Sequence, residues 1–89
     1  MRKIILFTVP GCAACEEFKP RFTKVMTSNS IPHEIVDLTK STPEFKQIAK
    51  AFDVYAFPTT IILNEDKGQM VEGNVSEDYL RAAIKKCFE

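Results

Sequence analysis

Two cysteines, Cys12 and Cys15, lie at the junction between an apolar run and a helical pattern. The apolar run covers residues 4–9 and ends in Pro10-Gly11, and a charged amphipathic stretch begins at Glu16. A strand that leads into a helix here puts Cys12 at the helix N-terminus, where unpaired backbone N–H groups and the helix dipole favour a thiolate. Cys15, in the first turn, is then close enough to form a disulfide with Cys12. The pair predicts thiol–disulfide exchange.

Composition narrows the class of protein. The chain has 89 residues, 45% of them hydrophobic, and a formal net charge of zero. We therefore expect one domain over residues 1–89, without an electrostatic surface for nucleic acid or an anionic membrane. No apolar run approaches the ~18 residues that cross a membrane. Because three cysteines without a signal sequence do not suggest a secreted disulfide scaffold, we expect a cytoplasmic protein.

Hydrophobic periodicity predicts seven elements in the order β-α-β-α-β-β-α. Continuous apolar or β-rich runs predict strands at residues 3–9, 31–38, 57–63 and 69–72. Apolar residues at helical spacing predict helices at residues 13–27, from Pro43 (with Thr42 as N-cap) and after Ser76. The first two strands, joined through a helix, should be parallel, and the last two should form a hairpin. A four-stranded mixed sheet with helices on both faces follows, an α/β fold.

With the dithiol at its strand-to-helix junction and this element order, the chain resembles the thioredoxin/glutaredoxin family over nearly its whole length. Pro20 lies inside the first helix, Phe57-Pro58-Thr59 opens the third strand, and Gly73 ends the sheet, as in that family. The resemblance implies a thioredoxin-like fold and a cis Pro58 against the disulfide. It also implies a substrate surface made of Pro10, Gly11, Ala13, Ala14, Phe57, Pro58 and Gly73.

The two halves of the chain resemble different branches of the family. The run from Phe7 to Cys12 resembles glutaredoxin, whereas residues 54–63 and the single Gly73 resemble thioredoxin. Glutathione-using relatives carry a basic residue where this chain has Val9, and a Gly-Gly-Asp-like element at Gly73. Thioredoxins carry a buried carboxylate, the usual proton acceptor for the second cysteine, where this chain has Leu6. The hybrid form is most similar to compact glutaredoxin-like thioredoxins.

The resemblance implies a role for each cysteine. Cys12 would attack a substrate disulfide as the nucleophile, and Cys15 would resolve the mixed disulfide, so that the Cys12–Cys15 disulfide is the redox group and no cofactor is bound. Backbone donors and the helix dipole lower the pKa of Cys12, whereas Glu16 and Glu17 oppose the thiolate. We therefore expect a modestly lowered pKa for Cys12 and a reductant rather than a strong oxidant. The expected partners of this monomer are disulfide-containing proteins and, as electron donor, either a thioredoxin-reductase-type enzyme or glutathione.

Other interpretations of the cysteines remain open at this stage. A structural zinc site needs four ligands, and the remaining candidates, His33 and Cys87, are far along the chain, so we expect no metal. Two inert core cysteines or a cluster bridged between two chains are further alternatives. Cys87 is in phase with an apolar helix face and is expected to be buried, with a regulatory thiol as the alternative.

The sequence therefore predicts a dithiol–disulfide oxidoreductase. The alternative within the same chemistry is a glutathione-coupled glutaredoxin. The alternative from another class is a non-catalytic binding module with the same fold, although such a module has no need of both cysteines.

Overall fold

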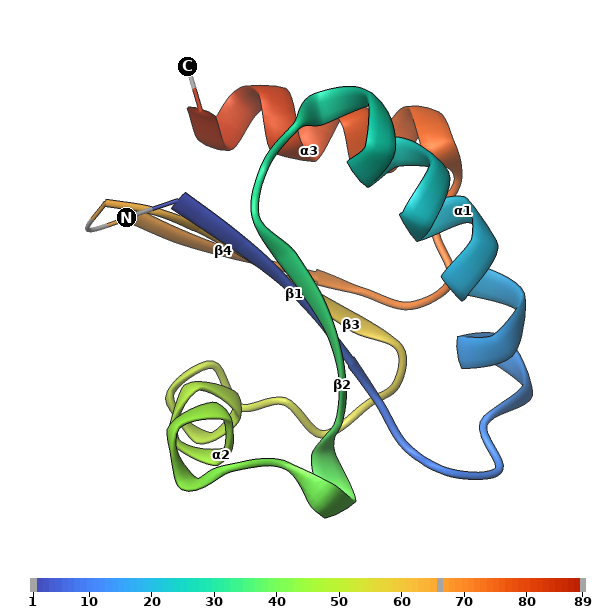
Figure 1. The fold of residues 1–89 in the computed structure, drawn as a ribbon, viewed down its shortest axis with the longest axis vertical. Helices are drawn as coiled ribbons and strands as arrows, with labels where there is room; N and C mark the ends of the chain where they lie inside the picture. The colour runs from blue at the N-terminus through green and yellow to red at the C-terminus, as the bar shows by residue number, and fades with distance from the viewer. Residues whose placement is uncertain (1, 66, 89) are drawn as a thin grey trace.

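The strands form one mixed sheet in which the first strand pairs on both sides (Figure 1). The computed structural model describes residues 2–65 and 67–88. Its strands are β1 (Arg2–Thr8), β2 (His33–Asp37), β3 (Thr59–Asn64) and β4 (Lys67–Glu72), in the spatial order β2-β1-β3-β4. β1 runs parallel to β2 and antiparallel to β3, and β3 pairs antiparallel with β4. The predicted parallel first pair and final hairpin are confirmed.

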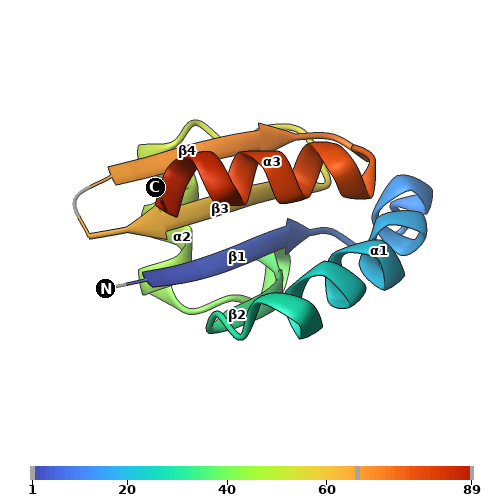
Figure 2. The same cartoon turned by 90° about the horizontal axis from the view of Figure 1, so that it is seen from above.

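Helices cover both faces of this sheet. They are α1 (Ala13–Asn29), α2 (Pro43–Ala51) and α3 (Glu77–Phe88), and a short 3-10 helix, η1 (Leu38–Lys40), follows β2. α1 and α3 lie side by side on one face, and α2 lies on the other (Figures 1 and 2). The predicted order of elements and the helices on both faces are confirmed, whereas η1 was not predicted. None of the helices in the described part of the chain is long and apolar enough to span a membrane.

β1 supplies side chains to two separate cores, because successive residues of a strand point to opposite faces. Ile4 and Leu6 belong to the cluster beneath α1 and α3, which we call the α1/α3 core. Ile5 and Phe7 belong to the cluster beneath α2. All four side chains are fully buried, which explains why the sequence of β1 is continuously apolar rather than alternating.

The buried faces of α1 and α3 are the apolar faces that the helical spacing of the sequence predicts. The buried residues of α3 are Leu80, Ala83, Ile84 and Cys87, and those of α1 are Cys15, Phe18, Phe22, Val25 and Met26. Except for Cys15, all of these residues belong to the α1/α3 core. Each helix therefore stabilises the fold mainly by burying one apolar face against the sheet.

Several predicted boundaries were wrong by one or two residues, each for a local reason. α1 continues past residue 27 to Asn29, whose side-chain amide donates to the Val25 carbonyl oxygen at 2.6 Å. β2 ends before residue 38, because the Asp37 carboxylate accepts a hydrogen bond from the Thr39 N–H and caps η1. β3 begins at Thr59 rather than at residue 57, directly after a cis peptide bond.

Phe22→Ala is expected to lower the free energy of unfolding by about 3–5 kcal/mol. The substitution removes a ring that is 0% exposed from the α1/α3 core. Thr23→Ala, at the next and exposed position of α1, is expected to change this free energy by less than about 0.5 kcal/mol. Urea denaturation followed by circular dichroism measures both. Equal effects of the two variants would contradict the assignment of this helix face to the core.

Candidate active site

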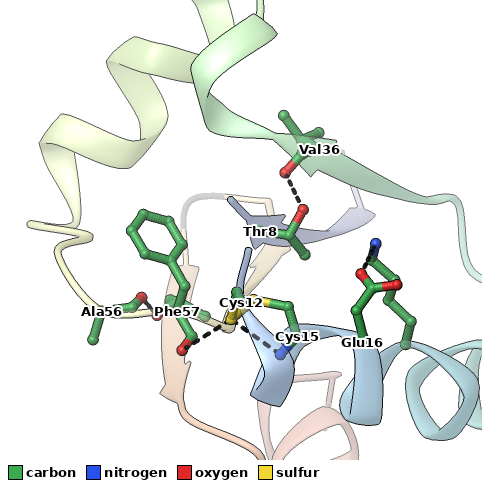
Figure 3. Close-up of a disulfide and its surroundings, with 9 residues drawn as sticks. Thr8, Cys12, Cys15, Glu16, Val36, Ala56 and Phe57 are labelled. Atoms are coloured by element: carbon green, nitrogen blue, oxygen red, sulfur yellow. Dashed lines mark hydrogen bonds and ion pairs between the residues drawn. A yellow bond between two sulfur atoms is a disulfide. The ribbon is translucent and has the colours of Figure 1, made fainter. Parts of the chain in front are cut away.

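The cysteine pair lies where β1 leads into α1, at one end of the sheet (Figure 3). Cys12 is the N-cap residue of α1, and Cys15 lies in the first turn of the helix. The two sulfur atoms form a disulfide, with 5.2 Å between the Cα atoms. The helix start that the sequence predicts therefore places both cysteines as expected.

The sulfur of Cys12 takes the position that a hydroxyl or carboxylate oxygen occupies in an ordinary N-cap. The backbone N–H of Cys15 donates a hydrogen bond to the Cys12 Sγ at 3.1 Å. The Glu16 N–H donates to the Cys12 carbonyl oxygen at 3.2 Å, which starts the helical hydrogen-bond pattern. An anion on Cys12 in the reduced protein would thus meet a backbone donor and the positive end of the α1 dipole.

The two cysteines differ in their access to solvent. Cys15 is 0% exposed, on the inner face of α1. Cys12 is only partly buried. A molecule that approaches from solvent therefore meets the sulfur of Cys12 first.

A second segment faces the disulfide from the start of β3. The peptide bond between Phe57 and Pro58 is cis, as predicted. The Phe57 carbonyl oxygen lies 3.8 Å from the Cys12 Sγ (Figure 3). Two hydrogen bonds hold this segment: the Gly73 N–H donates to the Pro58 carbonyl oxygen at 2.8 Å, and the Thr59 hydroxyl donates to the Ala56 carbonyl oxygen at 2.6 Å. Phe57, Pro58 and Gly73 are thus brought together on one side of the pair.

A pocket of about 510 Å³ lies on the other side of Cys12. Its wall includes Pro10, Gly11 and Ala13. Ala14, half-buried in the first turn of α1, is not part of this wall. Six of the seven predicted substrate-binding residues therefore divide into two groups, one on each side of the Cys12 sulfur, and Ala14 belongs to neither.

The charged part of this pocket was not predicted from the sequence. Glu16, Lys19, Asp37 and Lys40 also line it. Sheet topology explains the position of Asp37 and Lys40. Because β2 runs parallel to β1, its carboxyl end lies at the same end of the sheet as Cys12. That signal was available in the sequence, since the predicted parallel pairing brings the two strand ends together.

The charges in the pocket are largely compensated. The Lys19 Nζ lies 2.5 Å from the Glu16 Oε2, so the Glu16 carboxylate carries its own counter-ion. A hydrogen bond from the Thr39 hydroxyl holds the pKa of the Asp37 carboxyl below its ordinary value, with smaller contributions in the same direction from the Thr39 N–H, Lys40 and Lys19. Asp37 is thus an anion at neutral pH beside two cations.

Three other residues that the sequence singled out, Leu6, Cys87 and His33, do not line this pocket. Leu6 is 0% exposed and packs in the α1/α3 core. Cys87 is a free, buried cysteine on α3, as expected, with its Sγ 3.9 Å from the Ile62 carbonyl oxygen. The His33 ring lies edge-on against Phe22. Among residues 2–65 and 67–88, no group of three or more His, Cys, Asp or Glu side chains could hold a metal ion.

Comparison with known proteins finds the same fold in one protein family and in several solved structures. The family model of a thioredoxin-like domain matches residues 1–88. The chain is similar to a solved malarial protein, with 26% identity, a TM-score of 0.80, and coverage of 100% of this chain and 99% of that one. It is also similar to thioredoxin-2 of the malaria parasite, a component of the protein secretion machinery there, with 26% identity, a TM-score of 0.79, and coverage of 97% and 82%.

Mitochondrial thioredoxin 3 of Saccharomyces cerevisiae shares the fold, with 23% identity, a TM-score of 0.78, and coverage of 96% of this chain and 77% of that one. Comparison with curated protein sequences gives no match. The family match spans nearly the whole chain, and the cysteine pair within it is at disulfide distance. The chain therefore belongs to the thioredoxin-like family and is a thiol–disulfide oxidoreductase rather than a non-catalytic binding module.

Proposed function

We propose that the chain is a small thioredoxin-type electron carrier that reduces protein disulfides, with Cys12 as the nucleophile and Cys15 as the resolving cysteine. The observation that carries this proposal is the asymmetry of the pair. The Cys12 sulfur is partly accessible and accepts the Cys15 N–H at 3.1 Å, whereas the Cys15 sulfur is completely buried. Only a thiolate on Cys12 combines access with stabilisation by the helix N-terminus.

In the first step, the Cys12 thiolate attacks one sulfur of a substrate disulfide. The Cys12–substrate S–S bond forms, the substrate S–S bond breaks, and the departing substrate sulfur takes up a proton from water. In the second step, Cys15 loses its proton and attacks the Cys12 sulfur. The Cys12–Cys15 bond forms and the second substrate sulfur leaves as a thiolate, so that two electrons pass to the substrate and this chain is oxidised.

The segment before Pro58 supplies a place for the substrate chain. Within residues 2–65 and 67–88, no hydrogen bond uses the Phe57 N–H, and the Phe57 carbonyl oxygen points to the Cys12 sulfur. An extended substrate segment can pair with this backbone while its disulfide reaches Cys12. Pro10, Gly11 and Ala13, which carry no charge, would border the other side of that segment.

The same proposal extends to the setting in which the protein works. A reductant must be returned to its dithiol form, which happens in a reducing compartment, so we place the protein in the cytoplasm. The Cys12–Cys15 disulfide carries both electrons, so the reaction needs no bound cofactor. The chemistry is complete within one chain, and we propose a monomer.

Replacing each cysteine separately tests the assigned roles. Cys12→Ser is expected to abolish turnover of a protein disulfide with dithiothreitol as the reductant, because no nucleophile remains. Cys15→Ser is expected to accumulate a mixed disulfide with the substrate, because the resolving step is lost. Mass spectrometry of the intact protein detects the mixed disulfide.

Cys87→Ala is the matched control, because this cysteine is buried on α3 and remote from the pair. It is expected to keep the turnover of the wild-type protein. Full dithiol activity in Cys15→Ser, or a mixed disulfide on Cys15 in Cys12→Ser, would overturn the assignment of the two roles.

The electron donor distinguishes a thioredoxin-type carrier from a glutathione-coupled glutaredoxin. The pocket beside Cys12 contains Lys19 and Lys40, which could meet a glutathione carboxylate, but Lys19 is paired with Glu16 and Val9 presents no charge to the pocket. We therefore propose a thioredoxin-reductase-type enzyme as the donor.

Counting free thiols in the oxidised protein tests the choice of donor. One sample receives thioredoxin reductase with NADPH, and the other receives glutathione. The proposal predicts two new thiols rapidly in the first sample and slowly in the second. Rapid reduction by glutathione alone would contradict it and assign the chain to the glutaredoxin type. Cys12→Ser, in which the disulfide cannot form, is the control and is expected to gain no thiols in either sample.

A further inference from the structure

One buried polar atom on the face of the sheet beneath α1 has no partner. The Thr60 Oγ1 is buried without a hydrogen bond, and it is alone in this among the buried side-chain oxygen and nitrogen atoms of residues 2–65 and 67–88. Thr60 itself is 0% exposed. Leaving a buried hydroxyl unpaired is unfavourable, so such a group in a native fold calls for an explanation.

The register of the sheet places Thr60 on the same face as α1. Thr60 pairs with Leu6 of β1 and with Val71 of β4, and both neighbours belong to the α1/α3 core. Ile62, two positions along the same strand, belongs to that core as well, as the alternation of a strand requires. The Thr60 side chain therefore enters the space between the sheet and the helices α1 and α3.

Cys15 enters that space from the opposite side. It lies on the inner face of α1, one turn before Phe18 and two turns before Phe22, which both pack in the α1/α3 core. Because α1 follows β1 after a short loop and runs back over it, the first turn of α1 lies over the end of the sheet where β3 begins. Thr60 is three residues from Phe57, whose carbonyl oxygen lies 3.8 Å from the sulfur bonded to Cys15.

We propose that Thr60 is a positioning residue for the resolving step: in the reduced protein its hydroxyl donates a hydrogen bond to the Cys15 sulfur. This inference rests on the proposed role of Cys15. In the oxidised protein, the Cys15 sulfur is bonded to Cys12 and is an uncharged, weak acceptor, and the Thr60 Oγ1 makes no hydrogen bond. Reduction converts that sulfur into a thiol and then a thiolate, a much better acceptor.

The hydroxyl does not take the proton of Cys15, which passes to water. It stabilises the thiolate that remains, and that thiolate then forms the S–S bond to Cys12 as the substrate thiolate leaves. Leu6, the direct neighbour of Thr60 on β1, is apolar and provides no proton acceptor at this place. The polar side-chain group of the sheet that we assign to Cys15 is therefore a neutral donor, the Thr60 hydroxyl.

Four charged side chains near this end of the domain line the pocket described above: Glu16 and Lys19 of α1, Asp37 at the end of β2 and Lys40 of η1. Two more, Glu17 of α1 and Glu72 of β4, are exposed to solvent. The strand residues that face the α1/α3 core near Cys15 are Leu6, Thr60 and Val71, which are uncharged. Removing one hydroxyl there changes the surroundings of Cys15 without changing any charge.

A protein with a single thiol tests the contact without relying on catalysis. In a Cys12→Ala, Cys87→Ala background, Cys15 is the only thiol, and the ultraviolet absorbance of its thiolate is followed against pH. Thr60→Val, which has nearly the same shape without the hydroxyl, is expected to raise the Cys15 midpoint by about one pH unit. Thr60→Ser keeps the hydroxyl and is expected to bring the midpoint most of the way back to that of the protein with Thr60. Unchanged midpoints in all three proteins would overturn the inference.

The two-cysteine protein connects this contact with the reaction. A mixed disulfide between Cys12 and a small chromogenic thiol is prepared, and the release of that thiol is followed against pH. Thr60→Val is expected to slow the release about tenfold at pH 7 and to shift its pH profile by the same amount as the midpoint. A merely structural role of Thr60 would move neither profile.

The two experiments separate failure of the inference from failure of the proposed function. If the midpoint shifts in the single-thiol protein but no thiol is released from Cys12 in any variant, the assigned role of Cys15 is overturned and the contact is supported. If the release is rapid and identical in Thr60→Val and wild type, the function is supported and the role of Thr60 is overturned. Thr60→Val replaces an unpartnered hydroxyl with a methyl group, so the oxidised variant is expected to be at least as stable as wild type.

Discussion

The active site depends on one hydrogen bond, from the Cys15 N–H to the Cys12 sulfur at 3.1 Å. It exists because α1 begins immediately after Cys12, so that a free N–H of the first turn, that of Cys15, points at the sulfur. Two features set where α1 begins. One is β1, which is buried between two cores, and the other is the turn that joins β1 to α1. Gly11 in this turn has a φ of +72°, a conformation that favours glycine.

The same start of α1 also makes the two cysteines differ in their access to solvent. The N-cap position leaves Cys12 partly accessible, whereas the inner face of α1 encloses Cys15. The Phe57–Pro58 segment then limits the approach to Cys12 from one side, and the pocket with Lys19 and Asp37 borders the other. A reaction at the exposed sulfur followed by attack from the buried one is the order of events that this geometry favours. The thiolate is held by backbone groups, so the chemistry depends more on where the helix begins than on the residues between the cysteines.

Much of the fold could be predicted because its signals are local. The continuous apolar run of β1 and the helical spacing of Phe18 and Phe22 gave the layers, and the Cys12–Cys15 spacing at a helix start gave the disulfide. The cis bond before Pro58 came from the resemblance to a family, since X–Pro bonds of both kinds are allowed by their small energy difference. Element ends were less predictable: side-chain hydrogen bonds such as those of Asn29 and Asp37 set them.

What the sequence did not reveal depends on contacts across the sheet. Asp37 and Lys40 reach the site through the parallel pairing of β2 with β1, and Thr60 faces the α1/α3 core through its register with Leu6. In the sequence, Thr60 is one of several β-branched residues in a strand. Its unpaired hydroxyl becomes meaningful only when burial and the position of Cys15 are known.

Titration of Cys12 in the reduced protein tests the central claim most directly. The rate at which Cys12 is alkylated is measured against pH, with the modified peptide identified by mass spectrometry. Stabilisation by backbone donors at the start of α1 predicts a midpoint below the ordinary thiol value of about 8.5 but above about 5. A midpoint at or above the ordinary value would contradict the account, because the helix N-terminus would then give no stabilisation to the thiolate.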